Sequence, residues 1–222
     1  MMTIPHPKNF HTLIFDCDGV ILDSNSVKTN AFFTAASLYG VESANKLVKY
    51  HQNNGGISRY KKFDYFLKEI VCIDVDRFNL QRLLDIYSDE VLKGLYSCKS
   101  STALSKLLQL DPNIRKMVVS GGDEGELRAV FNVRGLYSLF PEGIFGSPET
   151  KDKILEREIL KNNIRFPALY IGDSRYDYRA AKSYGIDFLF VSAWSEFSEW
   201  RRFQSLHGFP FVYDLNTWLS EL

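Results

Sequence analysis

Short apolar runs bounded by turn-forming residues recur along the chain, at 13–16, 117–120, 144–146, 169–172, 188–191 and 211–213. Continuous runs of this length predict strands that are buried on both faces, since a half-exposed strand would alternate apolar and polar residues. Between the later runs, apolar residues recur at helical spacing over 124–132, 151–161 and 176–184. The alternation of strand and helix predicts an α/β fold with a parallel sheet.

The interval between residues 25 and 94 breaks this alternation. It contains no comparable strand run, but helical spacing is present at 27–39, 60–70 and 78–91. A polar, glycine-containing segment, 51–58, separates the first two of these. We therefore expect a discontinuous α/β core formed by 1–24 and 95–222, with an all-helical cap domain, 25–94, inserted after the first strand.

Composition narrows the classes of protein to consider. The 222 residues, 45% of them hydrophobic, suffice for a large domain or for a core with a smaller insertion. The 27 Lys and Arg residues balance the 27 Asp and Glu residues, so no net field favours nucleic acid or an anionic membrane as a partner. There is no apolar run of the ~20 residues that a spanning helix needs. Three cysteines without metal spacing, and no signal sequence, lead us to expect a soluble cytoplasmic protein.

The first apolar run delivers two carboxylates, Asp16 and Asp18, to its carboxyl end, where Gly19 lets the chain turn. Like charges this close raise each other's pKa and need a compensating cation. Ligands of open parallel sheets bind at the carboxyl ends of the strands, so the pair would face a ligand and the cap would lie above it. Taken alone, the segment is weak evidence, because a strand that ends in an Asp-rich turn is common and usually structural.

The second apolar run ends in Ser120, followed by Gly121 and Gly122. The hydroxyl can donate to an oxyanion, and small residues let backbone N–H groups approach a phosphate closely. The simpler interpretation is a serine that caps the following helix.

Two further segments carry candidate charges. Lys151 stands at the start of a helix, where the helix dipole disfavours a cation, so another interaction is expected to hold it. Lys153 is a nearby rival, and a solvated surface lysine is the usual alternative. The fourth apolar run ends in Asp173 and Asp177, with the spacing DxxxD.

In combination, these segments resemble the motifs of the haloacid dehalogenase superfamily, in particular its phosphatases with a helical cap after the first strand, the phosphoglycolate phosphatase and β-phosphoglucomutase-like branch. The matches are Asp16 to Val20, Ser120, Lys151 and Gly172 to Asp177. The resemblance covers nearly the whole chain and implies a Rossmann-like parallel sheet core beneath the cap.

The resemblance also implies roles for the matched acids. Asp16 would be the nucleophile that forms an aspartyl-phosphate, and Asp18 the general acid and base. Mg²⁺ would be bound by the carboxylates of Asp16 and Asp173 and by the backbone carbonyl of Asp18. Asp177 would support the metal shell or the lysine.

Phosphate binding is assigned in the same way to Ser120, Gly121 and Lys151. The roles agree with the chemistry, since phosphate monoester hydrolysis requires the barrier to fall by on the order of 20 kcal/mol, and a general acid alone gives about 10²- to 10⁴-fold. Carboxylates facing a phosphate dianion need positive charge, which Mg²⁺ and Lys151 supply. Oxygen ligands suit Mg²⁺, whereas no cluster of His and Cys suggests zinc.

The cap should select the substrate, because the core contacts only the phosphoryl group. Segment 51–59 combines hydrogen-bonding side chains, two glycines and a cation. Arg59 could pair with a carboxylate or a second phosphate of the substrate. Alternatively, Gly55 and Gly56 end one helix and Arg59 begins the next as a solvated residue.

The sequence thus predicts a Mg²⁺-dependent phosphomonoester hydrolase, a monomer or homodimer, acting on a small phosphorylated metabolite of the sugar phosphate or phosphoglycolate class. Asp18 favours this activity, because relatives that cleave carbon–halogen or carbon–phosphorus bonds generally lack a carboxylate there. A sugar phosphomutase, or a non-catalytic phosphate-binding regulatory protein on the same fold, remain the alternatives.

Overall fold

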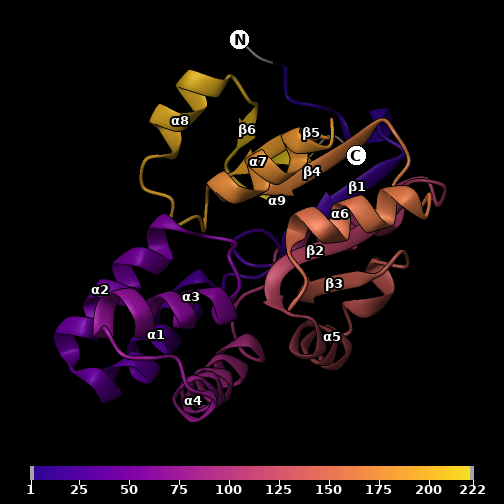
Figure 1. Ribbon diagram of the computed structural model, residues 1–222. Coiled ribbons are helices and arrows are strands. Elements are labelled where there is room, and N and C mark those ends of the chain that lie inside the picture. Colours follow the sequence, from indigo (N-terminus) through magenta and orange to yellow (C-terminus); the bar gives the residue numbers. More distant parts are fainter. Residues whose placement is uncertain (1–2, 221–222) are drawn as a thin grey trace.

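A six-stranded parallel sheet lies at the centre of the computed structural model, which describes residues 3–220 (Figure 1). The strands are β1 (Thr12–Phe15), β2 (Arg115–Asp123), β3 (Ile144–Ser147), β4 (Ala168–Gly172), β5 (Asp187–Val191) and β6 (Phe211–Val212). Their order in the sheet is β3-β2-β1-β4-β5-β6. The chain moves outward on one side of β1 and then returns to its other side, so the topological switch point lies between β1 and β4.

Helices cover both faces of the sheet. They are α5 (Glu124–Val133), α6 (Lys151–Leu160), α7 (Arg175–Ser183), α8 (Trp200–His207) and α9 (Leu215–Trp218). Alternate residues of β1 enter different apolar clusters: Leu13 and Phe15 pack with α5 and α9, whereas Ile14 packs with α6, α7 and α8. Both faces of each strand are therefore buried, which explains the continuous apolar runs and confirms the predicted Rossmann-like α/β class.

β2 differs from its prediction in length. The strand was expected to end at Ser120, but it continues to Asp123, and its register against β3 shifts between Val119 and Asp123. Such an irregularity lets a strand bend while it stays paired. Ser120, Gly121 and Gly122 therefore belong to the strand itself, and the predicted turn does not begin at Ser120.

A helical layer, drawn in purple to magenta, stands beside the carboxyl ends of the strands (Figure 1). It contains α1 (Asn25–Ala36), α2 (Val41–Asn53), α3 (Arg59–Tyr65), a π-helical turn (Phe66–Val71) and α4 (Arg77–Leu95). The predicted helical cap is thus present, and we keep 25–94 as its proposed extent. In the described residues, no helix has the length and apolar character needed to cross a membrane.

α2 was not predicted as a helix. It buries only Ala44, Leu47 and His51, at spacings of three and four residues, and most of its other residues are polar. The spacing is helical, but a stripe that contains a small residue and a histidine is less conspicuous in the sequence than the stripes of larger apolar residues around it. As a result, the first three residues of the expected loop 51–58 belong to a helix.

Two chain segments connect the core with the cap, and they lie side by side. The N–H of Asp23 donates to the carbonyl of Lys99 at 2.9 Å, and the N–H of Ser101 donates to the carbonyl of Ile21 at 2.9 Å. Between these bonds, Leu22 forms an antiparallel bridge with Ser100. The entry to the cap and the exit from it are therefore tied together by backbone hydrogen bonds.

Candidate active site

The structure brings the predicted core residues together at the carboxyl ends of β1, β2 and β4. The six buried side chains that meet there are those of Asp16, Asp18, Ser120, Lys151, Asp173 and Asp177. They come from segments up to 161 residues apart in sequence (Asp16 to Asp177). The parallel sheet places them at one edge because all its strands end on the same side.

Lys151 forms ion pairs with two of the acids. Its Nζ lies 2.7 Å from Oδ2 of Asp16 and also contacts Oδ1 of Asp177, and the lysine side chain is fully buried. Lys153, the rival from the sequence, is exposed. Burial raises the pKa of Asp16 to about 7, although the Lys151 ammonium opposes this. Burial alone would lower the pKa of Lys151, but Asp16 and Asp177 hold it well above its usual range.

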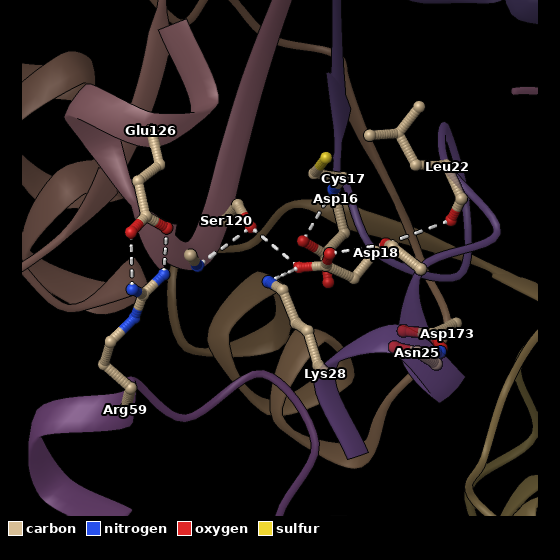
Figure 2. A network of polar contacts seen from close by, with 12 residues as sticks. Asp16, Cys17, Asp18, Leu22, Asn25, Lys28, Arg59, Ser120, Glu126 and Asp173 are labelled. Carbon is tan, nitrogen blue, oxygen red and sulfur yellow. Dashed lines mark hydrogen bonds and ion pairs between the residues drawn. The ribbon is translucent and has the colours of Figure 1, made fainter. Parts of the chain in front are cut away.

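Asp18 has a different environment, in which a second buried lysine neutralises it. Figure 2 shows Lys28 and Ser120 pointing toward its carboxylate. Lys28 Nζ forms an ion pair with Oδ2, Ser24 donates to Oδ1 at 2.6 Å, and Ser120 donates to Oδ2 at 3.4 Å. Burial raises the pKa of Asp18, but the Lys28 charge and the hydrogen bonds outweigh it, so the net shift is downward. Asp18 is therefore held ionised.

Asp173 is held by a residue of α1. Asn25 Nδ2 donates to Asp173 Oδ2 at 2.7 Å, and Figure 2 shows the two side chains side by side. The same amide also donates to the carbonyl of Trp194 at 2.8 Å. Gly19 has φ +75°, and a Cβ added to it would collide with the Asp173 carboxylate. Burial, followed by repulsion from Asp16 and Asp177, raises the pKa of Asp173 well above its usual range. The repulsion among these acids is thus only partly balanced by Lys151.

The acids fit a divalent cation. Asp16, Asp173 and Asp177 each offer a carboxylate oxygen, and these oxygens lie within 4.8 Å of one another. Both oxygens of Asp177 already have partners, because Oδ1 contacts Lys151 and Oδ2 accepts from Ser174 Oγ at 2.6 Å. Both oxygens of Asp16 have partners as well, because the N–H of Cys17 donates to Oδ1 at 2.7 Å and Lys151 contacts Oδ2. In the described residues, Asp173 has a partner on Oδ2 alone, which accepts from Asn25. Asp173 is therefore the carboxylate with the least committed oxygens, and the choice of Asp16 as the second direct ligand follows from the sequence resemblance. Hard carboxylate oxygens are suited to Mg²⁺.

Asp18 would join such a site only through its backbone. Its carboxylate is committed to Lys28 and Ser24. Among residues 3–220, no backbone or side-chain group donates a hydrogen bond to the carbonyl oxygen of Asp18. That oxygen is consistent with the backbone ligand that the sequence resemblance implies.

The serine and glycines of β2 lie where the core meets the cap. Ser120 Oγ accepts from the N–H of Gly122 at 3.1 Å and donates to Asp18 Oδ2 at 3.4 Å. The hydroxyl thus links the end of β2 to Asp18. A Cβ at position 121 would collide with the carbonyl oxygen of Gly56. Glycine at 121 is therefore required for the cap to approach this closely.

One cavity is shared by the core and the cap. Its core lining includes Asp16, Asp18, Gly121 and Asp173, and its cap lining includes Lys28, His51, Gly56, Arg59 and Lys62. A ligand at the acids would consequently be enclosed between the two layers. Enclosure of this kind excludes water and strengthens electrostatic interactions.

Arg59 lines this cavity, but its guanidinium already has partners within the protein. It does begin α3, but its side chain is only 4% exposed and thus is not solvated. Nη1 donates to Glu126 Oε1 at 2.7 Å and Nη2 donates to Oε2, as Figure 2 shows. Nη1 also donates to Ser88 Oγ at 2.8 Å. With its guanidinium committed to Glu126, the structure favours a contact between cap and core over the predicted contact with substrate.

Within the part of the chain that the structure describes, four side chains that bond to the carboxylates of the acids were not among the predicted site residues: Ser24, Asn25, Lys28 and Ser174. Asn25 and Lys28 lie in the first turn of α1, directly after the motif that contains Asp16 and Asp18. A lysine in a first helical turn is unfavourable for the helix dipole. The same signal that drew attention to Lys151 would have found Lys28.

Comparisons with known proteins agree with this geometry. The family model for haloacid dehalogenase-like hydrolases matches residues 13–191. No curated protein matches the chain. Among solved structures, a predicted phosphatase from Clostridium acetobutylicum is 18% identical, with a TM-score of 0.74 over 96% of this chain and 97% of that one.

Two further structures share the fold. A hydrolase from Pseudomonas syringae is 16% identical, with a TM-score of 0.75 over 95% of this chain and 97% of that chain. A β-phosphoglucomutase from Clostridium difficile is 18% identical, with a TM-score of 0.73 over 93% and 92%. The family model spans both the strand that carries Asp16 and the strand before Asp173. The chain therefore belongs to the haloacid dehalogenase-like hydrolases, a family of enzymes.

Proposed function

We propose that the protein is a Mg²⁺-dependent phosphatase that hydrolyses a small phosphorylated metabolite, of the sugar phosphate or phosphoglycolate class, through an aspartyl-phosphate at Asp16. The observation that carries this proposal is the buried contact of Asp16 with Lys151 at 2.7 Å, beside a cavity that Asp16, Asp18 and Asp173 line. A nucleophile, a cation for the phosphoryl oxygens and a proton-transfer group are thus present at one place.

In the first displacement, a carboxylate oxygen of Asp16 attacks phosphorus and the ester oxygen leaves. Asp18 gives that oxygen a proton, so the products are a free alcohol and phosphorylated Asp16. The ion pair with Lys28 keeps Asp18 ionised without substrate. The negative phosphoryl group raises the pKa of a neighbouring carboxylate, which favours the protonated form when substrate is bound.

In the second displacement, water attacks the phosphorus of the aspartyl-phosphate. Asp18, now ionised, takes the proton from the water, and the bond between Asp16 and phosphorus breaks to release phosphate. Lys151 neutralises the phosphoryl oxygens in both steps, together with the N–H groups near Gly121. Asp18 takes up its first proton from solvent when substrate binds, and after phosphate leaves it returns the proton gained from water to solvent. Asp16 and Asp18 are then back in their starting states.

Asp16, Asp173 and the backbone carbonyl of Asp18 are the groups that would hold Mg²⁺, with Asp177 beside them. The ion supplies positive charge against the phosphoryl oxygens and lowers the pKa of the carboxylates that bind it. Burial and mutual repulsion raise the pKa values of Asp16 and Asp173, and a bound cation would oppose both shifts.

Replacement of Asp16 by Asn tests the nucleophile. Hydrolysis of p-nitrophenyl phosphate and of a phosphometabolite panel is measured with Mg²⁺. We expect at least a ~10³-fold loss, because the amide is a poor nucleophile. Asp187→Asn is the control, since Asp187 is exposed at the opposite end of β5. Undiminished activity in Asp16→Asn excludes this nucleophile, and stoichiometric phosphate binding without turnover by the wild type supports a regulatory protein instead.

A further inference from the structure

Lys62 differs from the other buried cations of the protein. Residues 3–220 contain four other buried lysine and arginine side chains. Lys28, Arg59 and Lys151 form ion pairs with carboxylates. Lys116 donates to a backbone carbonyl. Lys62 is 1% exposed and has neither kind of partner in the described part of the chain. It is a buried ammonium without an anion.

The partner of Lys62 is an uncharged ring. Its Nζ lies 2.6 Å from Nδ1 of His51 and 5.3 Å from the centroid of Phe32. Burial, with the nearby cations, holds the pKa of His51 well below its usual range, so the imidazole is neutral and Nδ1 accepts from Lys62. His51 thereby orients the ammonium but does not neutralise it.

Both residues line the cavity that contains Asp16 and Asp18. Burial lowers the pKa of Lys62 to about 7, and the charge of Lys28 contributes in the same direction. A buried cation that lacks a counter-charge is costly for the folded protein. An anionic group bound in the cavity would supply that counter-charge and form a charge-assisted hydrogen bond.

We propose that Lys62, oriented by His51, forms a subsite for a second anionic group of the substrate, a carboxylate or a second phosphate, separate from the phosphoryl group that is hydrolysed. The inference rests on the proposed phosphatase function and restricts its substrate class. It also reassigns the role that the sequence gave to Arg59, whose guanidinium already binds Glu126. Lys28, the other fully paired buried cation in the cavity lining, forms an ion pair with Asp18.

Matched substrates test this subsite. One pair is phosphoglycolate and hydroxyethyl phosphate, which differ in a carboxylate; the other is 1,3-propanediol bisphosphate and 3-hydroxypropyl phosphate, which differ in a second phosphate. We expect the wild type to prefer the anionic member of one pair by at least ~10-fold in kcat/KM, the value of one charge-assisted hydrogen bond. The pair that shows the preference identifies the anion as carboxylate or phosphate.

Lys62→Met should reduce kcat/KM for the preferred anionic substrate by about 10- to 100-fold and leave the neutral member within about threefold. Lys62→Arg keeps the charge and should retain part of the preference for the anionic substrate. A loss of packing alone would lower kcat/KM for the anionic and the neutral substrate of a pair to the same extent. Lys62→Gln replaces the Met variant if that variant does not fold. Lys49→Met is the control, because Lys49 is an exposed lysine of α2.

The outcomes separate this inference from the proposed function. If the wild type hydrolyses p-nitrophenyl phosphate but shows no preference in either pair, or if Lys62→Met keeps the preference, the subsite is wrong and the phosphatase stands. If Asp16→Asn retains full activity, the phosphatase mechanism itself fails.

Discussion

Arg59 and Glu126 join the cap to the core through two parallel hydrogen bonds between guanidinium and carboxylate. Arg59 begins α3 of the cap, Glu126 lies in the first turn of α5 in the core, and their side chains are 4% and 14% exposed. Beside them, the hydroxyl of Tyr60 donates to Asp123 at 3.0 Å. This pair of contacts closes the cap over the cavity at the side of β2.

Removal of the Arg59 charge should therefore favour an open cap. Arg59→Met leaves the largely buried Glu126 carboxylate without its partner, so we expect kcat/KM to fall by about 10- to 100-fold and amide hydrogen exchange in α3 to increase. Exchange measured by mass spectrometry checks this. Glu90→Gln, which removes an exposed ion pair within α4, is the control. Unchanged exchange in α3 would show that the pair does not hold the cap.

The Lys28–Asp18 pair should make stability depend on pH in a defined direction. The lowered pKa of Asp18 means that the pair stabilises the fold above the ordinary carboxyl value of 3.8 and that this contribution is lost as the pH falls. In Lys28→Met, buried Asp18 takes up a proton at a higher pH. Urea unfolding with a chelator present should show a deficit of about 3–5 kcal/mol at pH 7 that shrinks as the pH falls.

A double-mutant cycle isolates this pair. In the Asp18→Asn background, Lys28→Met should have a much smaller effect at pH 7, because the carboxylate is already absent. A deficit that stays the same at pH 7 and pH 4 would mean that Lys28 acts through packing instead of charge.

Lys62 should lower stability at neutral pH. Its pKa is about 7 in the folded protein against an ordinary value of 10.5, so below pH 7 the fold carries the full penalty of a buried charge, about 3–5 kcal/mol. Between these values the unfolded state binds more protons, and wild-type stability rises with pH. Lys62→Met should therefore stabilise the protein most at pH 6 and less at pH 9, as measured by urea unfolding. An equal gain at both pH values would contradict a charged Lys62.

Mg²⁺ should stabilise the folded protein by binding to it. A ligand at 100 times its Kd contributes about 2.7 kcal/mol, which raises the melting temperature of a chain of this size by roughly 5–10 °C. Asp173→Asn should abolish the shift, and Asp187→Asn should preserve it. If the melting temperature of the wild type is the same with and without millimolar Mg²⁺, the acids do not form a metal site.

The sheet and the acids at its edge were predictable because their signals are local. The apolar runs are continuous because the sheet is covered on both faces, and Asp16 and Asp173 follow such runs directly. Parallel topology then brings their carboxyl ends together without further information. Lys151 was recognisable because it stands at an unfavourable place on a helix.

The cap side of the cavity was less accessible to sequence analysis. The partner of Arg59 is Glu126, 67 residues away on a different layer, and no local pattern links the two. Whether a cation is neutralised by the protein or left to a ligand is decided by such tertiary contacts. For the same reason, the sequence alone does not show that Lys62 is buried while its neighbour Lys61 is exposed.

Backbone hydrogen bonds join the two segments that connect core and cap, Ile21–Asp23 and Lys99–Ser101. The two connections therefore act as a single hinge, which we call the pivot of the cap. Asn25 and Lys28 follow that pivot directly and are part of the cap, yet they contact Asp173 and Asp18 of the core. Rotation about the pivot therefore changes the surroundings of both acids. Because these two side chains connect the acids to the cap, an opening of the cap for substrate exchange would also move the cation of Lys28 away from Asp18.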